Sequence, residues 1–290
     1  MQNTHAQYAK LVRLAAFSAF FGAILMIAIK LFAWFVTDAS AMLASASDSI
    51  LDLFASSINL VILRFALAPP DEEHKFGHGK AESLAGLLQS AFVMGSAGIL
   101  LLAGIDRVLS PVVISQVSVG VWVTIASLAI TFVVVAIQSM VIKKTKSVAI
   151  SADALHYKSD VILNLGVLLS LGLTQYLAPE VDGIFTCLVG IYLFWGGFKI
   201  VSTSVKGLMD EEISPEDKDK IVGIIKSHPQ VYGFHDLRTR TSGPVSFIQF
   251  HLEVSGELPL KVAHGIGDEV EALLKVQFPN ADVIIHLDPN

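Results

Sequence analysis

The sequence predicts an all-α transmembrane domain of six helices, followed by a C-terminal cytoplasmic α/β domain with the ferredoxin-like order αββαβ. The first observation is composition: 53% of the 290 residues are hydrophobic and only 16% are charged, as expected for a chain that lies largely in lipid. The second is a series of long apolar runs that ends near residue 206. The third is a change to alternating helix and strand patterns after that point. We therefore expect a membrane domain over residues 1–209 and a cytoplasmic domain over residues 210–290.

Six apolar runs predict the membrane-spanning helices. Each run is near or above the roughly 20 residues that a helix needs to cross the hydrocarbon core. The polar segment Met1–Lys10 leads directly into the first run, so we expect no cleavable signal peptide. The runs cover residues 14–36, 41–67, 82–109, 117–142, 150–174 and 182–206.

The distribution of positive charge predicts the orientation of these helices. If all six runs span the membrane, nearly all lysines and arginines near their ends lie on one side, and only Arg107 lies in a loop on the other. Loops rich in these residues stay in the cytoplasm, so both termini are expected there. Lys30, late in the first run, is expected to extend its ammonium outward to the membrane surface. The predicted cytoplasmic side holds Lys10, Arg13, Arg64, Lys75, Lys80, Lys143, Lys144, Lys146, Lys199 and Lys206.

Residues 211–290 show the pattern of a small α/β domain. An acidic first turn after Ser214 suits the N-terminus of a helix, and Ser242-Gly243-Pro244 is a turn signal between two β-rich runs. A domain of about 80 residues buries little core and is expected to depend on a metal ion or a dimer partner. The predicted elements are a helix over 214–227, strands over 231–241 and 245–254, a helix over 260–278 and a strand over 281–286.

The formal charge of −6 arises in this last part of the chain. Acidic and basic residues balance over 1–210, whereas 13 acidic residues face 7 basic ones over 211–290. An acidic surface repels nucleic acid and concentrates cations. We therefore expect no nucleic-acid partner, although solubility alone is a simpler explanation of the same charge.

Two pairs of ionisable residues inside the apolar runs predict a cation site within the membrane. Asp48 and Asp52 stand four residues apart in the second run, and His156 and Asp160 stand four apart in the fifth. This spacing puts each pair on one helix face. A charged side chain at membrane depth costs at least about 2.5 kcal/mol, so these groups need a partner, and a divalent cation supplies one. Two facing pairs offer four ligands, the number and type that tetrahedral zinc takes.

Ligand chemistry favours zinc or a neighbouring first-row ion. Cys187 is the single cysteine and lies in the sixth run, so thiolate-based metal sites are excluded. Oxygen and imidazole ligands favour zinc over copper(I), while cadmium, iron(II) and manganese stay as alternatives. Taken singly, each residue of the two pairs is more readily explained as a proton relay or an interhelical hydrogen bond. The two matched pairs together favour a metal.

A second candidate site lies in the loop between the second and third runs. Asp71, His74 and His78 offer three ligands within a short segment. The alternative is a solvated loop in which Asp71 caps a helix after Pro69-Pro70. Spacing alone weighs the two interpretations about equally.

A third candidate site is a group of histidines near the C-terminus. His235, His251 and His286 lie on or at the end of predicted strands, Asp288 follows two residues after His286, and His264 lies on the intervening helix. Individually, each histidine is more often a packed or surface residue, but four within this small domain favour ligands. One arrangement has Asp288 bridging two ions, with His235 and His251 serving one ion and His264 and His286 the other.

Three segments resemble the signature segments of the cation diffusion facilitator family: Ala46–Asp52, His74–Glu82 and Leu155–Asp160. The segments His235–Arg240 and Ile285–Pro289 resemble the tail of the bacterial zinc/iron-efflux branch of this family, typified by YiiP. The similarity covers nearly the whole chain.

The resemblance implies a homodimeric zinc/proton antiporter of the bacterial inner membrane, with zinc as substrate and as structural or regulatory ion. It implies a transport site at Asp48, Asp52, His156 and Asp160 and a loop site at Asp71, His74 and His78. It also implies a binuclear tail site at His235, His251, His264, His286 and Asp288.

Five positions matter further in this comparison. The resemblance implies a salt bridge between Lys80 and Asp210 and a hydrophobic gate at Leu155. Leu287 departs from the relative, which has a polar residue there. Many animal members have histidine at the position of Asp48. The aspartate resembles the bacterial members that accept both zinc and cadmium.

The ligand chemistry also predicts how the cation would leave. Protons compete for every carboxylate and imidazole of such a site, so an acidic outer compartment would release the metal and a neutral cytoplasm would reload the site. Helices rocking around a fixed site would give alternating access. Two other classes compete with this hypothesis. An intramembrane metalloprotease needs His-Glu-x-x-His, which the sequence lacks, and a membrane metal sensor would bind zinc without transport.

Overall fold

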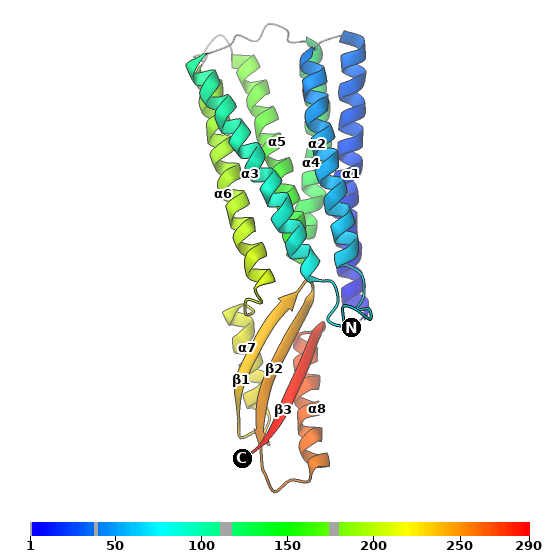
Figure 1. Ribbon diagram of the computed structural model, residues 1–290, viewed down its shortest axis with the longest axis vertical. Coiled ribbons are helices and arrows are strands. Elements are labelled where there is room, and N and C mark those ends of the chain that lie inside the picture. Colours follow the sequence, from blue (N-terminus) through cyan, green and yellow to red (C-terminus); the bar gives the residue numbers. More distant parts are fainter. Residues whose placement is uncertain (1, 38–39, 111–117, 174–179) are drawn as a thin grey trace. The chain divides into compact units, whose positions relative to one another are not determined.

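A computed structural model describes residues 2–37, 40–110, 118–173 and 180–290 of the chain (Figure 1). Six long helices precede a small α/β region in the described residues. The predicted run ends at residues 117 and 174 lie outside the described residues. The helices are α1 (Gln2–Thr37), α2 (Ser40–Ala66), α3 (Lys80–Leu109), α4 (Ser118–Thr145), α5 (Val148–Leu173) and α6 (Glu180–Leu208).

The chain divides into two compact units. The first, here called the membrane unit, contains Lys10–Leu67 and Ala81–Val205. The second, here called the tail unit, contains Ala68–Lys80 and Lys206–Asn290 together with the first residues of the chain. The loop between α2 and α3 therefore belongs with the C-terminal region rather than with the helices that it connects.

Within the described ranges, five helices are long and apolar enough to cross a membrane. They cover Ala6–Val36, Ser45–Ala66, Lys80–Leu109, Val121–Thr145 and Gly183–Leu208. Helix α5 has 26 residues, but Asp153, Lys158 and Asp160 interrupt its apolar sequence. The chain is therefore a membrane protein, and α5, with three charged residues, is the long helix of the described part that this criterion of length, hydropathy and charge does not include.

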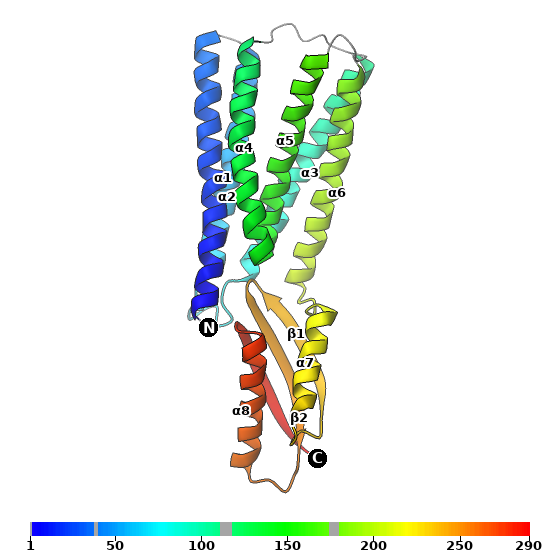
Figure 2. The ribbon, with the colours of Figure 1, turned by 180° about the vertical axis from the view of Figure 1, so that it is seen from behind.

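Helix α5 lies between α4 on one side and α3 and α6 on the other, as Figures 1 and 2 both show. Helices α3 and α6 approach closely, because a Cβ atom on Gly104 would lie only 2.9 Å from the carbonyl oxygen of Gly183. Small residues permit such backbone contact between membrane helices. This packing encloses α5 on several sides.

Three polar contacts fix α5 within the membrane unit. The buried Glu82 of α3 accepts a hydrogen bond from the backbone N–H of Val148, at 3.1 Å, and so caps the first turn of α5. The buried Tyr157 hydroxyl donates to the carbonyl oxygen of Ala19 on α1, at 3.2 Å, and lies 3.3 Å from the Ser56 hydroxyl on α2. Helix α5 is thereby held against three neighbours.

The tail unit confirms the predicted order of helix, strand, strand, helix and strand. Strands β1 and β2 pair antiparallel and β2 and β3 pair parallel, in the order β1-β2-β3. Strand β3 extends past the predicted end at 286, because its pairing with β2 continues to Pro289. The elements are α7 (Pro215–Ser227), β1 (Gly233–Ser242), β2 (Val245–Val254), α8 (Leu260–Gln277) and β3 (Ala281–Pro289).

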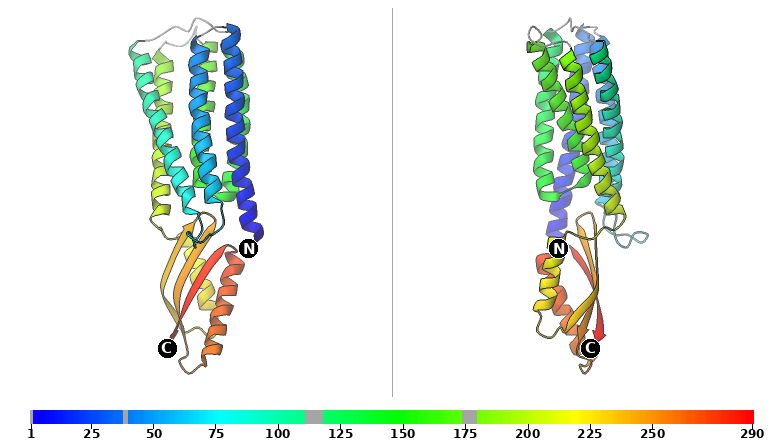
Figure 3. Two further views of the ribbon diagram at one scale, coloured as in Figure 1. Left: turned by 45° about the vertical axis from the view of Figure 1, so that its right-hand side comes forward. Right: turned by 90° about the vertical axis from the view of Figure 1, so that its left-hand side faces the viewer.

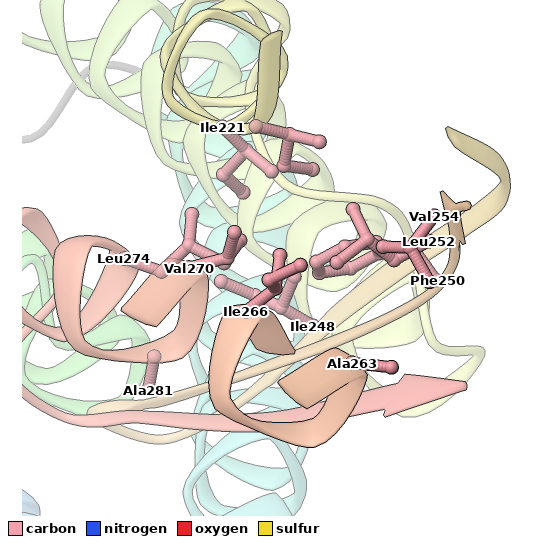
Figure 4. Packing of buried hydrophobic residues seen from close by; sticks show 11 residues of the cluster. Ile221, Ile248, Phe250, Leu252, Val254, Ala263, Ile266, Val270, Leu274 and Ala281 are labelled. Atoms are coloured by element: carbon pink, nitrogen blue, oxygen red, sulfur yellow. The ribbon is translucent and has the colours of Figure 1, made fainter. Parts of the chain in front are cut away.

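Both tail helices cover the same face of the sheet, which the right-hand view of Figure 3 shows nearly edge-on. Alternate residues of β2, namely Ile248, Phe250 and Leu252, point into the core between the sheet and the helices (Figure 4). They meet Ile221 of α7 and Val270 of α8, among others. Because side chains alternate along a strand, His251 and its alternate neighbours lie on the opposite face.

Shortening a core side chain of this sheet should destabilise the tail locally. We expect Ile248→Ala to lower the free energy of opening of β2 by about 2–5 kcal/mol, because Ile248 is fully buried. Amide hydrogen exchange of the full chain measures this change. The matched control is Ile284→Ala on β3, whose side chain is 51% exposed and should cost about 0.5 kcal/mol or less. Equal losses in the two variants would contradict the described packing.

Candidate metal centres

Asp52 of α2 and His156 and Asp160 of α5 converge in the membrane unit. The Nε2 atom of His156 lies 2.8 Å from an Asp52 oxygen and 3.7 Å from an Asp160 oxygen. One ligand atom from each residue falls within 4.8 Å of the other two. The side chains are 18%, 20% and 27% exposed for His156, Asp52 and Asp160, respectively. This geometry suits a small cation that takes oxygen and nitrogen ligands.

Asp48 is the predicted transport-site residue that this group does not include. It lies one helical turn before Asp52 on α2, as the four-residue spacing predicts, and it is exposed. The described geometry therefore brings three of the four predicted residues together and leaves the fourth beside them on the same helix.

A cavity of about 540 Å³ opens onto this group between α2, α3 and α5. Asp52 and His156 contribute polar atoms to its wall, and Gln89 of α3 adds an amide. Most of the remaining wall is apolar, with Phe54 and Phe92 as its largest members. An ion that enters the cavity therefore meets few polar groups besides Asp52 and His156.

Sequence reasoning missed Asp153, which is buried on α5 one turn before His156. Gln89 of α3 donates to one of its oxygens at 3.1 Å, and Gln138 of α4 donates to the other at 2.7 Å. An acid inside an apolar run three residues from a candidate ligand was a signal that could have identified it. Asp153 joins three helices at the depth of the metal-ligating group.

The expectation for Lys30 was wrong. Its ammonium does not extend outward to the membrane surface but donates to the Ser49 hydroxyl at 2.6 Å and to the carbonyl oxygen of Ser45 at 3.2 Å, both on α2. The reason is that the neighbouring helix offers two acceptors at the same depth. Hydropathy and position along one helix do not show such acceptors.

Leu155, the residue implied as a hydrophobic gate, packs beside the metal-ligating group. It contacts the apolar cluster that Val93 and Ala97 of α3 form with Val189 and Leu193 of α6. A Cβ atom on Gly196 of α6 would lie 2.6 Å from Leu155, so the two helices approach closely here. The position suits a gate, whose action stays a prediction.

The loop residues Asp71, His74 and His78 also converge, within the tail unit. The Asp71 carboxylate lies 3.2 Å from Nδ1 of His74 and 3.1 Å from Nε2 of His78, and their ligand atoms lie within 4.8 Å of one another. Gly77, at φ = 77°, provides the left-handed conformation that the tight loop requires. The backbone N–H of His74 donates to Asp71 and holds the pKa of that carboxyl below its ordinary value. An ionised carboxylate and two imidazoles form a suitable cation site.

The tail histidines lie side by side because of the strand register. His235 of β1 pairs with His251 of β2, which pairs with His286 of β3. The Asp288 carboxylate lies 3.1 Å from His235, 2.8 Å from His251 and 3.2 Å from His286. A hydrogen bond with His251 lowers the pKa of Asp288, so this carboxylate is ionised at neutral pH. It is placed to bridge ions held by the histidines.

His264 does not join this cluster within one chain. It lies on α8, which covers the core face of the sheet, whereas the other three histidines occupy the opposite face. Its Nδ1 atom lies instead 3.2 Å from Asp268. The single chain therefore does not bring His264 to His286, and an ion shared by these two histidines stays a prediction. Leu287, where the relative has a polar residue, packs into the tail core and points away from the histidine face. An apolar side chain suits this position.

The implied pair of Lys80 and Asp210 is present, at 2.9 Å. Arg240 also approaches Asp210, at 3.3 Å, and its guanidinium lies over the rings of Phe76 and Phe247. The loop between α2 and α3 is thus joined to β1 and β2 within the tail unit. The hydrogen bond from Lys80 lowers the pKa of Asp210.

An apolar helical unit with a candidate cation site between its helices, followed by an α/β unit with a candidate histidine site, fits the class of membrane cation transporters. The family comparison agrees with this class. Residues 16–209 match the cation efflux transmembrane domain, and residues 213–290 match the cytoplasmic domain of cation efflux proteins. The chain belongs to the cation efflux family, also called the cation diffusion facilitators, and is a transporter rather than an enzyme.

Individual relatives cover almost the whole chain. It is 45% identical to the cation-efflux pump FieF of Yersinia enterocolitica over 283 residues, which are 98% of this chain and 94% of that protein. It is also 45% identical to FieF of Escherichia coli K12 over 282 residues, with 97% and 94% coverage. Among solved structures, the zinc form of CzrB is 37% identical to this chain. The match covers 28% of this chain and 93% of the CzrB chain, with a TM-score of 0.27.

Removing the Asp210 charge should loosen the loop between α2 and α3. We expect Asp210→Asn to speed amide exchange over residues 68–80 by up to about fivefold at neutral pH, because exposed ion pairs contribute about 1 kcal/mol or less. The Asp210 pKa is lowered in the folded chain. The wild-type contribution is therefore fully present above the ordinary aspartate pKa, and it is lost as the pH falls through the lowered value.

Hydrogen exchange of the full chain at several pH values checks this expectation. The matched control is Glu211→Gln, which removes an exposed pair with Lys206 and should leave the exchange of the loop unchanged. Equal acceleration in both variants, or a difference that persists in strong acid, would count against it.

Proposed function

We propose that this chain exports a divalent, zinc-like cation in exchange for protons, by alternating access around a site between α2 and α5. The observation that carries the proposal is the convergence of Asp52, His156 and Asp160 within 4.8 Å, between apolar helices. Uncompensated carboxylates at membrane depth are costly, and a divalent cation compensates them. The site belongs to a member of the cation efflux family, which supports transport as its purpose.

The ligand types favour zinc among the candidate ions. Asp48, one turn from Asp52 on the same face of α2, is the proposed fourth ligand and would complete a tetrahedral set of three carboxylates and one imidazole. Cadmium and iron(II) accept similar ligands and are the nearest alternatives. Each ligand is also a base, so protons arriving from an acidic exterior would displace the ion.

We also propose that six helices span the bacterial inner membrane, with both termini in the cytoplasm. Helix α5 is the sixth span, because 26 residues rise about 39 Å, enough to cross a hydrocarbon core of about 30 Å. Asp153 and Asp160 of this helix have partners within the bundle, namely Gln89 and Gln138 for Asp153 and His156 for Asp160. The excess of lysine and arginine at one set of helix ends supports the orientation.

The two family matches support the domain boundary proposed between residues 209 and 210. The first match ends at residue 209, and the second begins at residue 213. The order of helices and strands in residues 210–290 supports a ferredoxin-like classification for the cytoplasmic domain. We propose that this domain forms the two-fold contact of a homodimer, the commonest closed symmetry.

The tail site is proposed as a regulator of transport. Zinc at this site is not the transported ion, so it would affect flux only by favouring one conformation over another. Its proposed ligands are His235, His251, His286 and Asp288. The loop site at Asp71, His74 and His78 is proposed as a second cytoplasmic zinc site. Rising cytoplasmic zinc would fill these sites and tighten the dimer.

Replacing a transport-site ligand should abolish flux without unfolding the chain. We expect reconstituted wild-type protein to move zinc with counterflow of protons, and Asp52→Ala to reduce the zinc flux at least about 100-fold, because a ligand is lost. Sealed proteoliposomes with a zinc indicator and a pH indicator measure both flows. The matched control is Asp106→Ala, which removes an exposed acid of α3 and should leave flux unchanged.

Two outcomes of this assay would overturn the proposal. Undiminished zinc uptake by Asp52→Ala would refute the site assignment. Zinc binding by the wild type with no flux would favour the alternative, a membrane metal sensor without transport.

Removing the bridging carboxylate of the tail should weaken the response to zinc. We expect wild-type protein to scatter light as a dimer in detergent and to melt at a higher temperature with zinc than without. In Asp288→Ala, the increase in melting temperature should fall by at least about half, because three histidines lose their shared carboxylate. Asp282→Ala, an exposed acid on the same strand, is the control. A monomer at micromolar concentration with zinc, or an undiminished shift in Asp288→Ala, would refute the regulatory role.

A further inference from the structure

Lys30 is a cation beside the transport site that the proposed function does not use. Its side chain is only partly exposed, although it lies well inside the apolar helix α1. Its ammonium donates to the Ser49 hydroxyl at 2.6 Å and to the Ser45 carbonyl oxygen at 3.2 Å. Ser49 is fully buried and directly follows Asp48 on α2. The contacts hold a full positive charge next to a proposed ligand.

The partners of Lys30 explain its position but not its charge. Both acceptors are neutral, so a polar uncharged side chain would also satisfy them, without the cost of burying an ion. The ammonium instead interacts electrostatically with the carboxylates of Asp48 and Asp160, one from each helix of the site. A positive charge in this place repels an incoming cation.

The formal charges of the site show what the ammonium changes. Asp48, Asp52 and Asp160 supply three negative charges, and His156 is neutral when it binds a metal. With Lys30 the group carries two negative charges, which one divalent cation neutralises. This count covers the proposed ligands and Lys30 only; Asp153 is not among the converging ligand atoms, and its two oxygens accept hydrogen bonds from the neutral amides of Gln89 and Gln138.

We propose that Lys30 sets the charge of the transport site, so that binding one divalent cation makes the loaded site neutral within the membrane. The inference rests on the proposed transport function and adds a residue on α1 to it. A neutral loaded site avoids the cost of moving or enclosing net charge at membrane depth. A monovalent or trivalent cation in the same place would leave one net charge.

The same charge keeps binding weak enough for release. Without the ammonium, three carboxylates attract the cation with no opposing charge, and the bound ion is held more tightly. Tighter binding of substrate lowers the Michaelis constant but slows the release that each cycle requires. A lysine that served only to join α1 to α2 would not produce this combination.

The test compares zinc flux through full-length variants in sealed proteoliposomes over a range of zinc concentrations. Lys30→Gln keeps two N–H donors for Ser45 and Ser49 and removes the charge. We expect its Michaelis constant for zinc to fall at least about fivefold and its maximal rate to fall at least about fivefold. Lys30→Arg, which keeps the charge, should bring the Michaelis constant back to within about threefold of the wild type.

Lys158→Gln is the matched control, because it neutralises another lysine of an apolar helix and leaves the contacts of Lys30 intact. An unchanged or raised Michaelis constant in Lys30→Gln would overturn the proposal, as would equal shifts in Lys158→Gln. If Lys30→Gln does not fold, Lys30→Met is measured in its place. Failure of both neutral variants to fold, while Lys30→Arg folds, would make Lys30 a folding determinant and would also overturn the proposal.

The same assay separates this inference from the function on which it rests. Absence of zinc flux in the wild type would refute the proposed transport itself. Wild-type flux with no shift in Lys30→Gln would refute only the role of Lys30.

Discussion

The cost of placing charge in lipid is the constraint on which the membrane unit depends. At about 2.5 kcal/mol or more for each group, no ionisable side chain can be kept there without a partner. Asp52, His156 and Asp160 face one another, Asp153 accepts from two amides, and Lys30 donates to α2. The same cost supports the proposal that a divalent cation offsets the carboxylates of this site.

Helix α5 is where these requirements meet. It carries two proposed ligands and the buried Asp153, and it is the long helix of the described part of the chain that length and composition alone do not identify as a membrane span. Contacts from α1, α2, α3 and α4 hold it: Tyr157 with Ala19 and Ser56, Glu82 at its first turn, and the two glutamines at Asp153. The placement of the ligands therefore follows from these polar contacts around them rather than from the ligands themselves.

In the tail unit, the core residues and the candidate metal ligands lie on opposite faces of the sheet, because side chains alternate along each strand. One face of β2 supplies Ile248, Phe250 and Leu252 to the core, and the other supplies His251 to the row that His235 and His286 complete. A slip of one residue in register would exchange the two faces and destroy both. His264 lies apart from the row of histidines because its helix, α8, covers the core face of the sheet.

The long apolar helices, the order of elements in the tail and most candidate ligands could be predicted from the sequence, because hydrophobic periodicity and four-residue spacing are local properties. Which of these ligands meet could not be predicted, since that depends on helix pairing and strand register. In the membrane unit, Asp48 lies beside the group of Asp52, His156 and Asp160, and Asp153 lies one turn before His156 with its own partners. In the tail unit, His264 lies apart from the other histidines, and Leu287 packs into the core. The tertiary structure also placed the Lys30 ammonium on α2, because its acceptors lie on another helix, and no pattern along one helix records the neighbour across from it.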